Sequence, residues 1–423
     1  MNLKTTENRA PVQNFFDAAI ACYVTSPKGI DFNRMRLADG VLFEVSDTAQ
    51  EAQAAAVDRL IKALGAIRGH AADIEPLLWQ AVADALKAGL TSLHQGDVDT
   101  LLDTISENAG KEVDLIKPCH SVVLLENTNN IVVGPVKIRR SSKALSEIRR
   151  LCPKSKIEVG EGPDIETDVM DVQIPHFVWQ VKLAAASKVR EEQAAWMVDI
   201  ALSLVRLGVK PTNLGMNPPA LGKVEAPPFS KSKADHNRMT IGESGRYSIG
   251  GWTMPCVYQL GIPAQRELSK RDFVKKAGLV FSSSKSSLAE RFSQGLGWIA
   301  RGRQSSDRPT RLLYFFTAIE ALLSDSDKTA PIVQTVARHG SVLLSDKNEY
   351  RIEIAKTIRQ LYGLRSSLVH TGKRGVVDKD ANTIQYIADL LFCKVWNDVD
   401  LSMKHSRFVE VLSKASYGLP AKF

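Results

Sequence analysis

The stretch EYRIEIAKTIRQLYGLRSSLVHTG, residues 349–372, decides how the C-terminal third of the chain is expected to fold. Its bulky apolar residues recur at steps of three and four, which predicts one helix with a single apolar stripe. The members of this stripe are Ile354, Ile358, Leu361 and Leu368. Position 365 falls on the same stripe but is an arginine. Because an unpaired buried charge is costly, Arg365 requires a carboxylate, a phosphate or a cluster of carbonyl groups. Gly372 is expected to end the helix.

His370 is the second notable side chain of this helix, five positions after Arg365. On an ideal helix the two side chains point about 140° apart, so one straight helix does not direct them at a common target. Two arrangements would bring them together. Either the helix ends near His370, or two copies of the chain face each other across a dimer axis.

The expected partner of Arg365 lies upstream, in LLYFFTAIEALL, residues 312–323. Glu320 is the only charged residue among the bulky apolar residues of this segment. If the two helices pack together, Glu320 is the natural carboxylate for Arg365. Such a contact has two interpretations, a buried structural ion pair or part of a functional site.

These segments resemble the ApeA-like branch of the HEPN superfamily. The resemblance rests on TAIEALL at 317–323, VARHGSVLL at 336–344 and IRQLYGLRSSLVHTGKR at 358–374, and it covers roughly residues 285–423. The family marker is an arginine, then a polar residue, and a histidine a few positions later. Here these are Arg365, Ser366 and His370.

The resemblance implies a homodimeric endoribonuclease that needs no metal or other cofactor. RNA supplies its own nucleophile, the 2′-hydroxyl, so the protein must position it, move protons and stabilise charge on phosphorus. An imidazole titrates near neutral pH and can move the proton, which is the role expected for His370. A guanidinium can bind the non-bridging phosphate oxygens, which is the role expected for Arg365. Glu320 is expected to orient Arg365, and Ser366 to support the motif.

The same resemblance implies a prokaryotic antiviral defence system of the abortive-infection type. Residues 1–285 would then sense a trigger, restrain the nuclease or bind another subunit. Two alternatives stay open. The C-terminal bundle is a non-catalytic dimerisation or RNA-binding module, or the protein is the toxin of a toxin–antitoxin pair.

Length and composition indicate the fold class and the number of domains. A chain of 423 residues with 44% hydrophobic and 24% charged residues is typical of a globular protein with two or three domains. We expect an α+β protein that is predominantly α-helical. Its predicted segments are a helical N-terminal subdomain (1–117), a mixed region with a hairpin, a long helix and Gly/Pro/Ser-rich loops (118–285), and an antiparallel HEPN-like bundle (286–423).

Two segments of the mixed region carry specific predictions. SVVLLENTNNIVVGPVKI, residues 121–138, has two β-branched runs around Asn127–Asn130, which predicts a β-hairpin that turns there. Residues 177–207 show apolar residues at helical spacing and predict one long amphipathic helix. The expected chain of helices in the bundle starts at 287, 310, 330, 350 and 382.

A net charge of +8 is compatible with a polyanionic partner such as RNA. The densest basic stretch follows the predicted hairpin and includes Arg139 and Arg140. A second basic segment, with Lys373 and Arg374, directly follows the motif. Both are candidate contacts to RNA phosphates, and a solvated surface is the alternative for each.

The remaining features predict a cytoplasmic protein. The five cysteines are far apart and form no CxxC or zinc-ligand pattern, so we expect reduced thiols and no metal site. The first residues do not show the basic segment followed by an apolar segment that is typical of a signal peptide. No stretch of the sequence is long and apolar enough to span a membrane. Phosphate-loop, zinc-protease and α/β-hydrolase motifs are also missing from the sequence.

Overall fold

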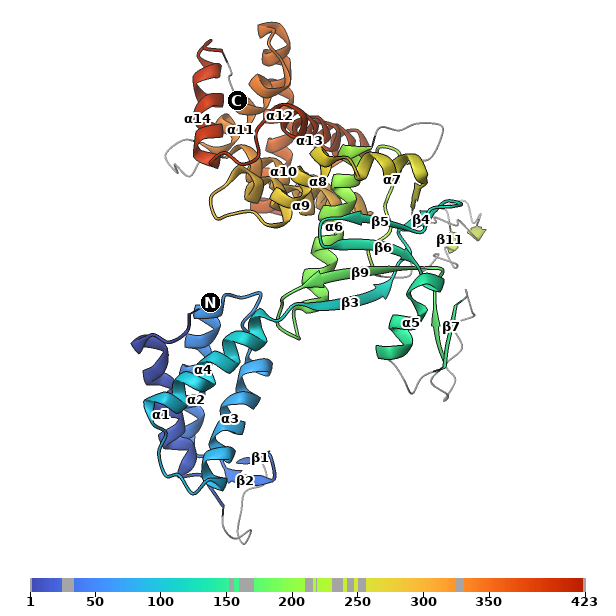
Figure 1. The fold of residues 1–423 in the computed structure, drawn as a ribbon. Coiled ribbons are helices and arrows are strands. Elements are labelled where there is room, and N and C mark those ends of the chain that lie inside the picture. Colours follow the sequence, from blue (N-terminus) through green and yellow to red (C-terminus); the bar gives the residue numbers. More distant parts are fainter. Residues whose placement is uncertain are drawn as a thin grey trace. The chain divides into compact units, whose positions relative to one another are not determined.

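The computed structural model (Figure 1) describes residues 2–24, 34–151, 156–159, 171–209, 216–217, 219–229, 239–241, 247–249, 256–324 and 331–420. The chain divides into two compact units. Unit 1 comprises Met1–Leu115 and Lys182–Ala194, and unit 2 comprises Ile116–Val181 and Ala195–Phe423. Most described residues are helical and the strands are short, which confirms a predominantly helical α+β fold. Within the described residues, no helix is long and apolar enough to cross a membrane.

Unit 1 is a small helical unit with one short hairpin (Figure 1). Its elements are α1 (Thr6–Ile20), β1 (Met35–Ala38), β2 (Val41–Glu44), α2 (Asp47–Leu64), α3 (Ala71–Lys87) and α4 (Gln95–Gly110). Trp79 is fully buried and lies against the rings of Phe15 and Phe43, with centroids 5.1 and 4.9 Å away. Ser46 caps α2 by accepting a hydrogen bond from the Ala49 amide at 3.2 Å. Gly65 ends α2 with a positive φ of 80°.

Unit 2 contains most of a four-stranded sheet in the order β3-β9-β6-β5. The strands are β3 (Val113–Pro118), β5 (Asn130–Val133), β6 (Val136–Arg140) and β9 (Phe177–Leu183), and α5 (Ser141–Leu151) follows β6. Helix α6 (Arg190–Gly208) covers one face of the sheet, where Ala201, Leu202 and Val205 lie against β5, β6 and β9 (Figure 1). The remaining short strands are β4 (Val122–Leu124), β7 (Lys156–Val159), β8 (Asp171–Ile174), β10 (Met216–Asn217), β11 (Met239–Ile241), β12 (Tyr247–Ile249) and β13 (Tyr258–Leu260).

The predicted hairpin around Asn127–Asn130 is wrong. Its first run forms β4, which pairs in parallel with β13, a strand far later in the chain. Its second run is itself the hairpin, because β5 and β6 are antiparallel and turn at Gly134. Gly134 has a positive φ of 58°, a conformation that glycine adopts at little cost.

The long helix predicted over 177–207 is also wrong in its first part. Residues 177–183 form β9, and the helix begins only at Arg190. β9 lies between β3 and β6, and both faces of the strand are largely buried. A strand buried on both faces lacks strict alternation of apolar and polar residues, so its apolar positions also match helical spacing.

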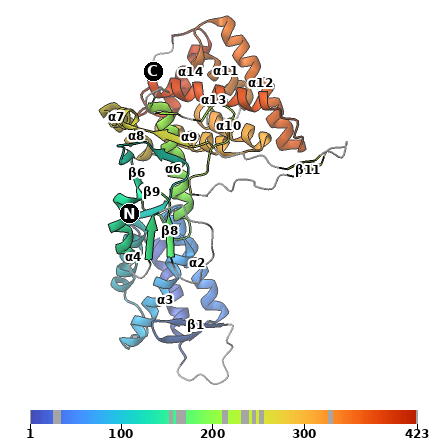
Figure 2. The same cartoon turned by 90° about the vertical axis from the view of Figure 1, so that its right-hand side faces the viewer.

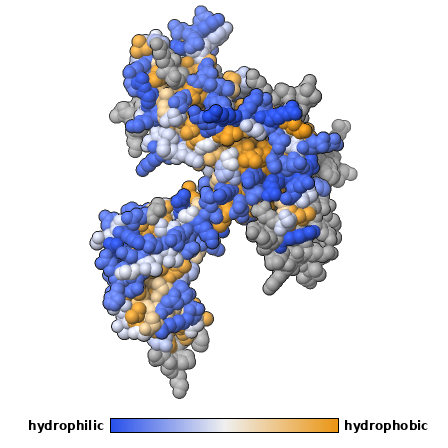
Figure 3. All heavy atoms as spheres, in the orientation of Figure 1, coloured by the Kyte–Doolittle hydropathy of each residue, from blue (hydrophilic) through white to orange (hydrophobic). Residues whose placement is uncertain are grey.

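The C-terminal part of unit 2 is helical, as predicted. Its elements are α7 (Ile262–Leu268), α8 (Arg271–Phe281), α9 (Leu288–Gln304), α10 (Arg308–Leu323), α11 (Ile332–Leu344), α12 (Asn348–Thr371), α13 (Asp378–Asp398) and α14 (His405–Ser416). The predicted helices correspond to α9–α13, and α14 was not predicted. Figure 2 shows α9–α14 gathered together, and in Figure 3 hydrophobic residues reach the visible surface over this helical part. Glycines permit the close packing, because a Cβ at Gly302 would meet the Phe315 ring at 2.9 Å.

A buried network of charged groups joins the strand-bearing and helical parts of unit 2. The Arg303 side chain of α9 is 4% exposed, and its guanidinium donates to the Asp389 carboxylate of α13. The carboxylate of Glu225 is 5% exposed. It accepts from Arg206 of α6 at 2.5 Å and from the Tyr258 hydroxyl at 2.9 Å. Arg303 Nε lies 3.9 Å from Glu225, so the network links α9 and α13 to Glu225 and its partners within unit 2.

Asp199 of α6 is a second buried charge, with its side chain 0% exposed. Its carboxylate lies 2.8 Å from Arg301 Nε and accepts a hydrogen bond from Gln304 at 2.5 Å. Burial raises the pKa of Asp199 to about 7, although Arg301 and Gln304 favour the ionised form. Folded protein therefore retains this proton at pH values where unfolded protein has lost it.

We expect the Asp199→Asn substitution to change how stability depends on pH. Between about pH 4 and pH 7 the raised pKa makes the wild type lose stability as pH rises, by at most about 1.4 kcal/mol per pH unit. Asparagine cannot ionise and still accepts from Gln304. The variant should therefore gain stability relative to the wild type as pH rises from 4 to 7 and keep that gain above pH 7, measured by denaturant unfolding at each pH. A pH-independent difference between the two proteins would contradict this assignment.

Candidate functional site

Helix α12 carries the predicted motif and ends where the sequence predicted. Gly372 has a left-handed φ of 68°, and its amide donates to the Leu368 carbonyl at 3.1 Å. His370 is still helical, so it and Arg365 point about 140° apart within one chain. The end of the helix therefore does not bring them together within one chain.

Arg365 and Glu320 are in contact across α12 and α10. Arg365 Nη2 donates to Glu320 Oε2 at 3.2 Å, and the two side chains are 24% and 19% exposed. Arg365 Nε and Nη1 form no hydrogen bond with any residue that the structure describes. The guanidinium is thus held on one side and open on the other.

Tyr362 completes this cluster and was not predicted as a site residue. Arg365 lies over the Tyr362 ring, 5.1 Å from its centroid. That ring makes an edge contact with Phe316 of α10, at a centroid distance of 5.3 Å. Tyr362 precedes Arg365 by three positions, which places both on one side of a helix. This spacing was the signal in the sequence that could have identified it.

Burial dominates the electrostatics of the Glu320 carboxylate. It raises the pKa of Glu320 above its ordinary value, although the Arg365 charge and the nearby Tyr362 hydroxyl favour the ionised form. Glu320 Oε1 is buried and accepts no hydrogen bond from the described residues. Burial and the Glu320 charge likewise raise the pKa of the Tyr362 phenol. The carboxylate can therefore hold Arg365 in place but is poorly solvated itself.

His370 and Ser366 lie apart from this ion pair. The His370 side chain is exposed on the last turn of α12. Ser366 is half-buried directly after Arg365. The structure thus brings Arg365 and Glu320 together and leaves His370 separate.

The four predicted RNA-binding cations differ in what they contact. Lys373 is exposed beside the end of α12. Arg374 donates to Asp307, the N-cap residue of α10, and 65% of its side chain is exposed. Arg139 donates to Gln180 at 2.8 Å and to the Lys143 carbonyl at 2.9 Å.

Arg140 donates to three backbone carbonyls and lies over the Phe177 ring at 5.5 Å. The guanidiniums of Arg139 and Arg140 are therefore bonded within the protein. Of the four cations, Lys373 is the best placed to contact a phosphate near the motif.

The described residues contain no group of three or more His, Cys, Asp or Glu side chains arranged to hold a metal ion. The described cysteines Cys22, Cys119, Cys256 and Cys393 are free thiols. Cys152 and residues 230–238 of the Gly/Pro/Ser-rich part lie outside the described residues.

The chain matches no family model, no curated protein and no solved structure.

Proposed function

We propose that this protein is a metal-independent endoribonuclease in which Arg365 and His370 from two subunits of a homodimer form one active site. The proposal rests on the contacts of the Arg365 guanidinium, which is held on one side and open on the other. Glu320 and Tyr362 hold its guanidinium, while Nε and Nη1 bond to none of the described residues. Nε and Nη1 lie on different edges of the guanidinium, so each can donate a hydrogen bond to a separate phosphate oxygen.

The chemistry follows from these two side chains. His370 takes the proton from the RNA 2′-hydroxyl, and the resulting oxygen attacks the adjacent phosphorus. The bond to the 5′-oxygen breaks, that oxygen receives a proton, and the upstream product carries a 2′,3′-cyclic phosphate. Arg365 stabilises the charge on the non-bridging oxygens during this step. DNA lacks the 2′-hydroxyl and is not a substrate.

An apolar groove on the helices supports a dimer through the HEPN-like helical region. The groove lies between α12 and α13, has a volume of about 550 Å³, and is lined by Ile354, Tyr386 and Leu390. Tyr386 is 54% exposed and Leu390 is 38% exposed. Glu353, Lys394 and Asp398 also line the groove, and Lys394 pairs with Asp398 at 2.6 Å, so the apolar residues are the part of the groove that a second copy would cover. We propose that the second subunit covers it.

The wider role rests on the resemblance to ApeA-like HEPN proteins. On that basis we propose a role in a cytoplasmic prokaryotic antiviral defence system. Residues 1–285 would then respond to a trigger, restrain cleavage or recruit another subunit.

A second candidate is a non-catalytic dimerisation or RNA-binding module. The mostly buried contact between Glu320 and Arg365 favours it, because such a pair can serve structure alone. The two candidates differ in what Arg365→Ala does. A catalytic arginine leaves a folded but inert protein, whereas a structural one leaves a protein that melts several degrees lower.

The proposal is tested by RNA cleavage with purified protein in excess EDTA. We expect the wild type to cut single-stranded RNA and to leave cyclic phosphate ends. The His370→Ala variant should be slower by about a thousand-fold or more, because it loses the group that moves the proton. Gel analysis and 3′-end mapping report both results.

His405 provides a second-histidine control, because it lies outside the motif, is buried, and hydrogen bonds the Leu322 carbonyl at 2.8 Å. His405→Gln should keep cleavage if it folds, which circular dichroism reports. Equal cleavage by wild type and His370→Ala would show that the motif is not the active site. Cleavage that EDTA abolishes would contradict the metal-independent mechanism.

A further inference from the structure

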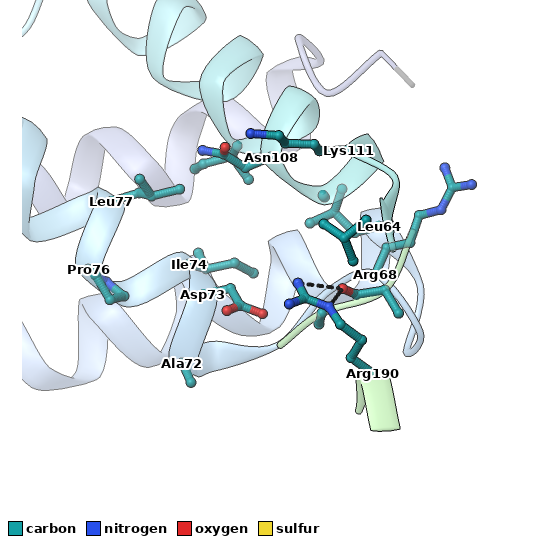
Figure 4. Close-up of a pocket in the computed structure, with 15 residues that line it drawn as sticks. Leu64, Arg68, Ala72, Asp73, Ile74, Pro76, Leu77, Asn108, Lys111 and Arg190 are labelled. Atoms are coloured by element: carbon teal, nitrogen blue, oxygen red, sulfur yellow. Dashed lines mark hydrogen bonds between the residues drawn. The ribbon is translucent and has the colours of Figure 1, made fainter. Parts of the chain in front are cut away.

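Unit 1 contains a cavity that the proposed nuclease does not use. It has a volume of about 350 Å³ and lies among α2, α3, α4 and the segment that leads into α6 (Figure 4). That segment is attached to the rest of unit 1 by the Ala186 amide, which donates to the Ile67 carbonyl at 2.9 Å. Cavities of this size accommodate small molecules.

The polar groups at the cavity leave an excess of unused positive charge. Asp73 is the one acidic residue of the lining, and both its oxygens accept from Ser187, at 2.7 Å from the amide and 2.5 Å from the hydroxyl. Arg190 donates Nε and Nη2 to the Ala185 carbonyl at 3.4 and 3.2 Å. Within the described residues, Arg190 Nη1 and the Lys111 ammonium bond to no acceptor.

Figure 4 shows how these cations lie. Arg190 extends into the cavity beside Asp73, and Lys111 lies with Asn108 on the opposite wall. The guanidinium of Arg68 points away from the cavity. Arg190 is also the first residue of α6, and Ala72 belongs to the first turn of α3. Leu64 and Asn108 lie in the last turns of α2 and α4, so the negative ends of two helix dipoles offset these positive ends, and the side-chain cations alone favour an anion.

The rest of the lining is aliphatic. Leu64, Ile74 and Ile105 are buried in the core of unit 1 and form part of the wall. None of the fifteen lining residues is aromatic. A nucleobase would find no ring to stack on, so the walls favour a compact saturated body.

We propose that this cavity binds a small organic anion, with a carboxylate or phosphate head on Arg190, the charge of Lys111 on the opposite wall favouring the anion, and a saturated body against the aliphatic wall. Asn108 supplies a neutral hydrogen-bonding group beside the head. Asp73 accepts hydrogen bonds from Ser187 and keeps its negative charge, so Arg190, Lys111 and Asp73 together leave one excess positive charge at the cavity.

Isothermal titration calorimetry of the full chain tests this site with cyclohexanecarboxylate, cyclohexyl phosphate and the neutral cyclohexylmethanol. We expect at least one of the two anions to bind once per chain, and the alcohol of similar shape to bind at least ten-fold more weakly. The tighter of the two anions identifies the head group.

Lys111→Gln and Arg190→Gln should each weaken binding about ten-fold. Lys111 is exposed and its ammonium bonds to no described residue, so its variant should fold normally. Arg68→Gln is the matched control, because it removes a cation of the same lining whose guanidinium points away, and it should bind like the wild type. Failure of both anions to bind, equal binding of the alcohol, or equal losses in Arg68→Gln and Lys111→Gln would overturn the proposal.

Discussion

Mixing equal amounts of Arg365→Ala and His370→Ala subunits is expected to restore about a quarter of wild-type RNA cleavage, although neither variant cleaves alone. Arg365 and His370 point about 140° apart on one continuous helix, so the proposed site takes the arginine of one subunit and the histidine of the other. A two-fold dimer has two such sites. In the mixed dimer one site carries both substitutions and the other carries none. About half of the dimers are mixed, and half of their sites are intact.

The measurement is the initial rate on single-stranded RNA after the subunits have exchanged, with exchange followed by differently tagged chains. A second mixture serves as the control. Wild type mixed with the double variant Arg365→Ala/His370→Ala should retain about a quarter of the activity of an all-wild-type sample. A site contained in one subunit would retain about half there, and would show no recovery in the first mixture. Either result would exclude the shared site.

The contact between Arg365 and Glu320 was predictable because charges are rare on apolar stripes. Arg365 and Glu320 are each the one charged residue on the apolar face of their segment, so each was almost the only partner available to the other. The end of α12 was predictable for a similar local reason, since Gly372 follows directly after the motif. The contact of Arg374, by contrast, could not be predicted from the sequence. Its bond to Asp307 joins two segments distant in sequence, and no local sequence pattern predicts such a contact.

The predictions for β4 and β9 failed for the same reason: both strands take their structure from distant parts of the fold. β4 resembles half of a hairpin because two β-branched runs flank a turn-forming segment, yet it pairs with β13 far along the chain. β9 resembles the start of a helix because its position inside the sheet buries both faces. Pairing between distant strands depends on the tertiary fold, whereas helix periodicity is local. Helices α9–α13 were accordingly predicted, and the sheet was not.

Replacing Arg303 with methionine is expected to lower the free energy of unfolding of unit 2 by about 3–5 kcal/mol. The side chain is 4% exposed, bonds to Asp389, and lies 3.9 Å from Glu225. Methionine fills much of the same space but leaves the Asp389 carboxylate without its buried partner. Glu225 keeps Arg206 and Tyr258, so the loss is concentrated on Asp389.

Scanning calorimetry can follow this change, because two compact units are expected to give two transitions. The midpoint temperature of the unit 2 transition should fall, and that of the unit 1 transition should not change. Arg308→Met is the matched control. Arg308 lies at the start of α10 with its side chain 50% exposed, 3.5 Å from Asp378, and exposed ion pairs contribute little. Similar shifts for Arg303→Met and Arg308→Met would show that burial does not set the strength of this contact.

The double variant Arg303→Met/Asp389→Leu separates two explanations of that loss. If the cost comes mainly from a partly buried carboxylate left without a partner, removing the carboxylate as well should recover more than half of the lost stability. If the network instead stabilises unit 2 through its attraction, the double variant should be no more stable than the single one. We expect recovery, because Asp389 is only 26% exposed and its bond is to a guanidinium removed from water. The charged network would then specify how the strand-bearing and helical parts of unit 2 pack, without supplying much of their stability.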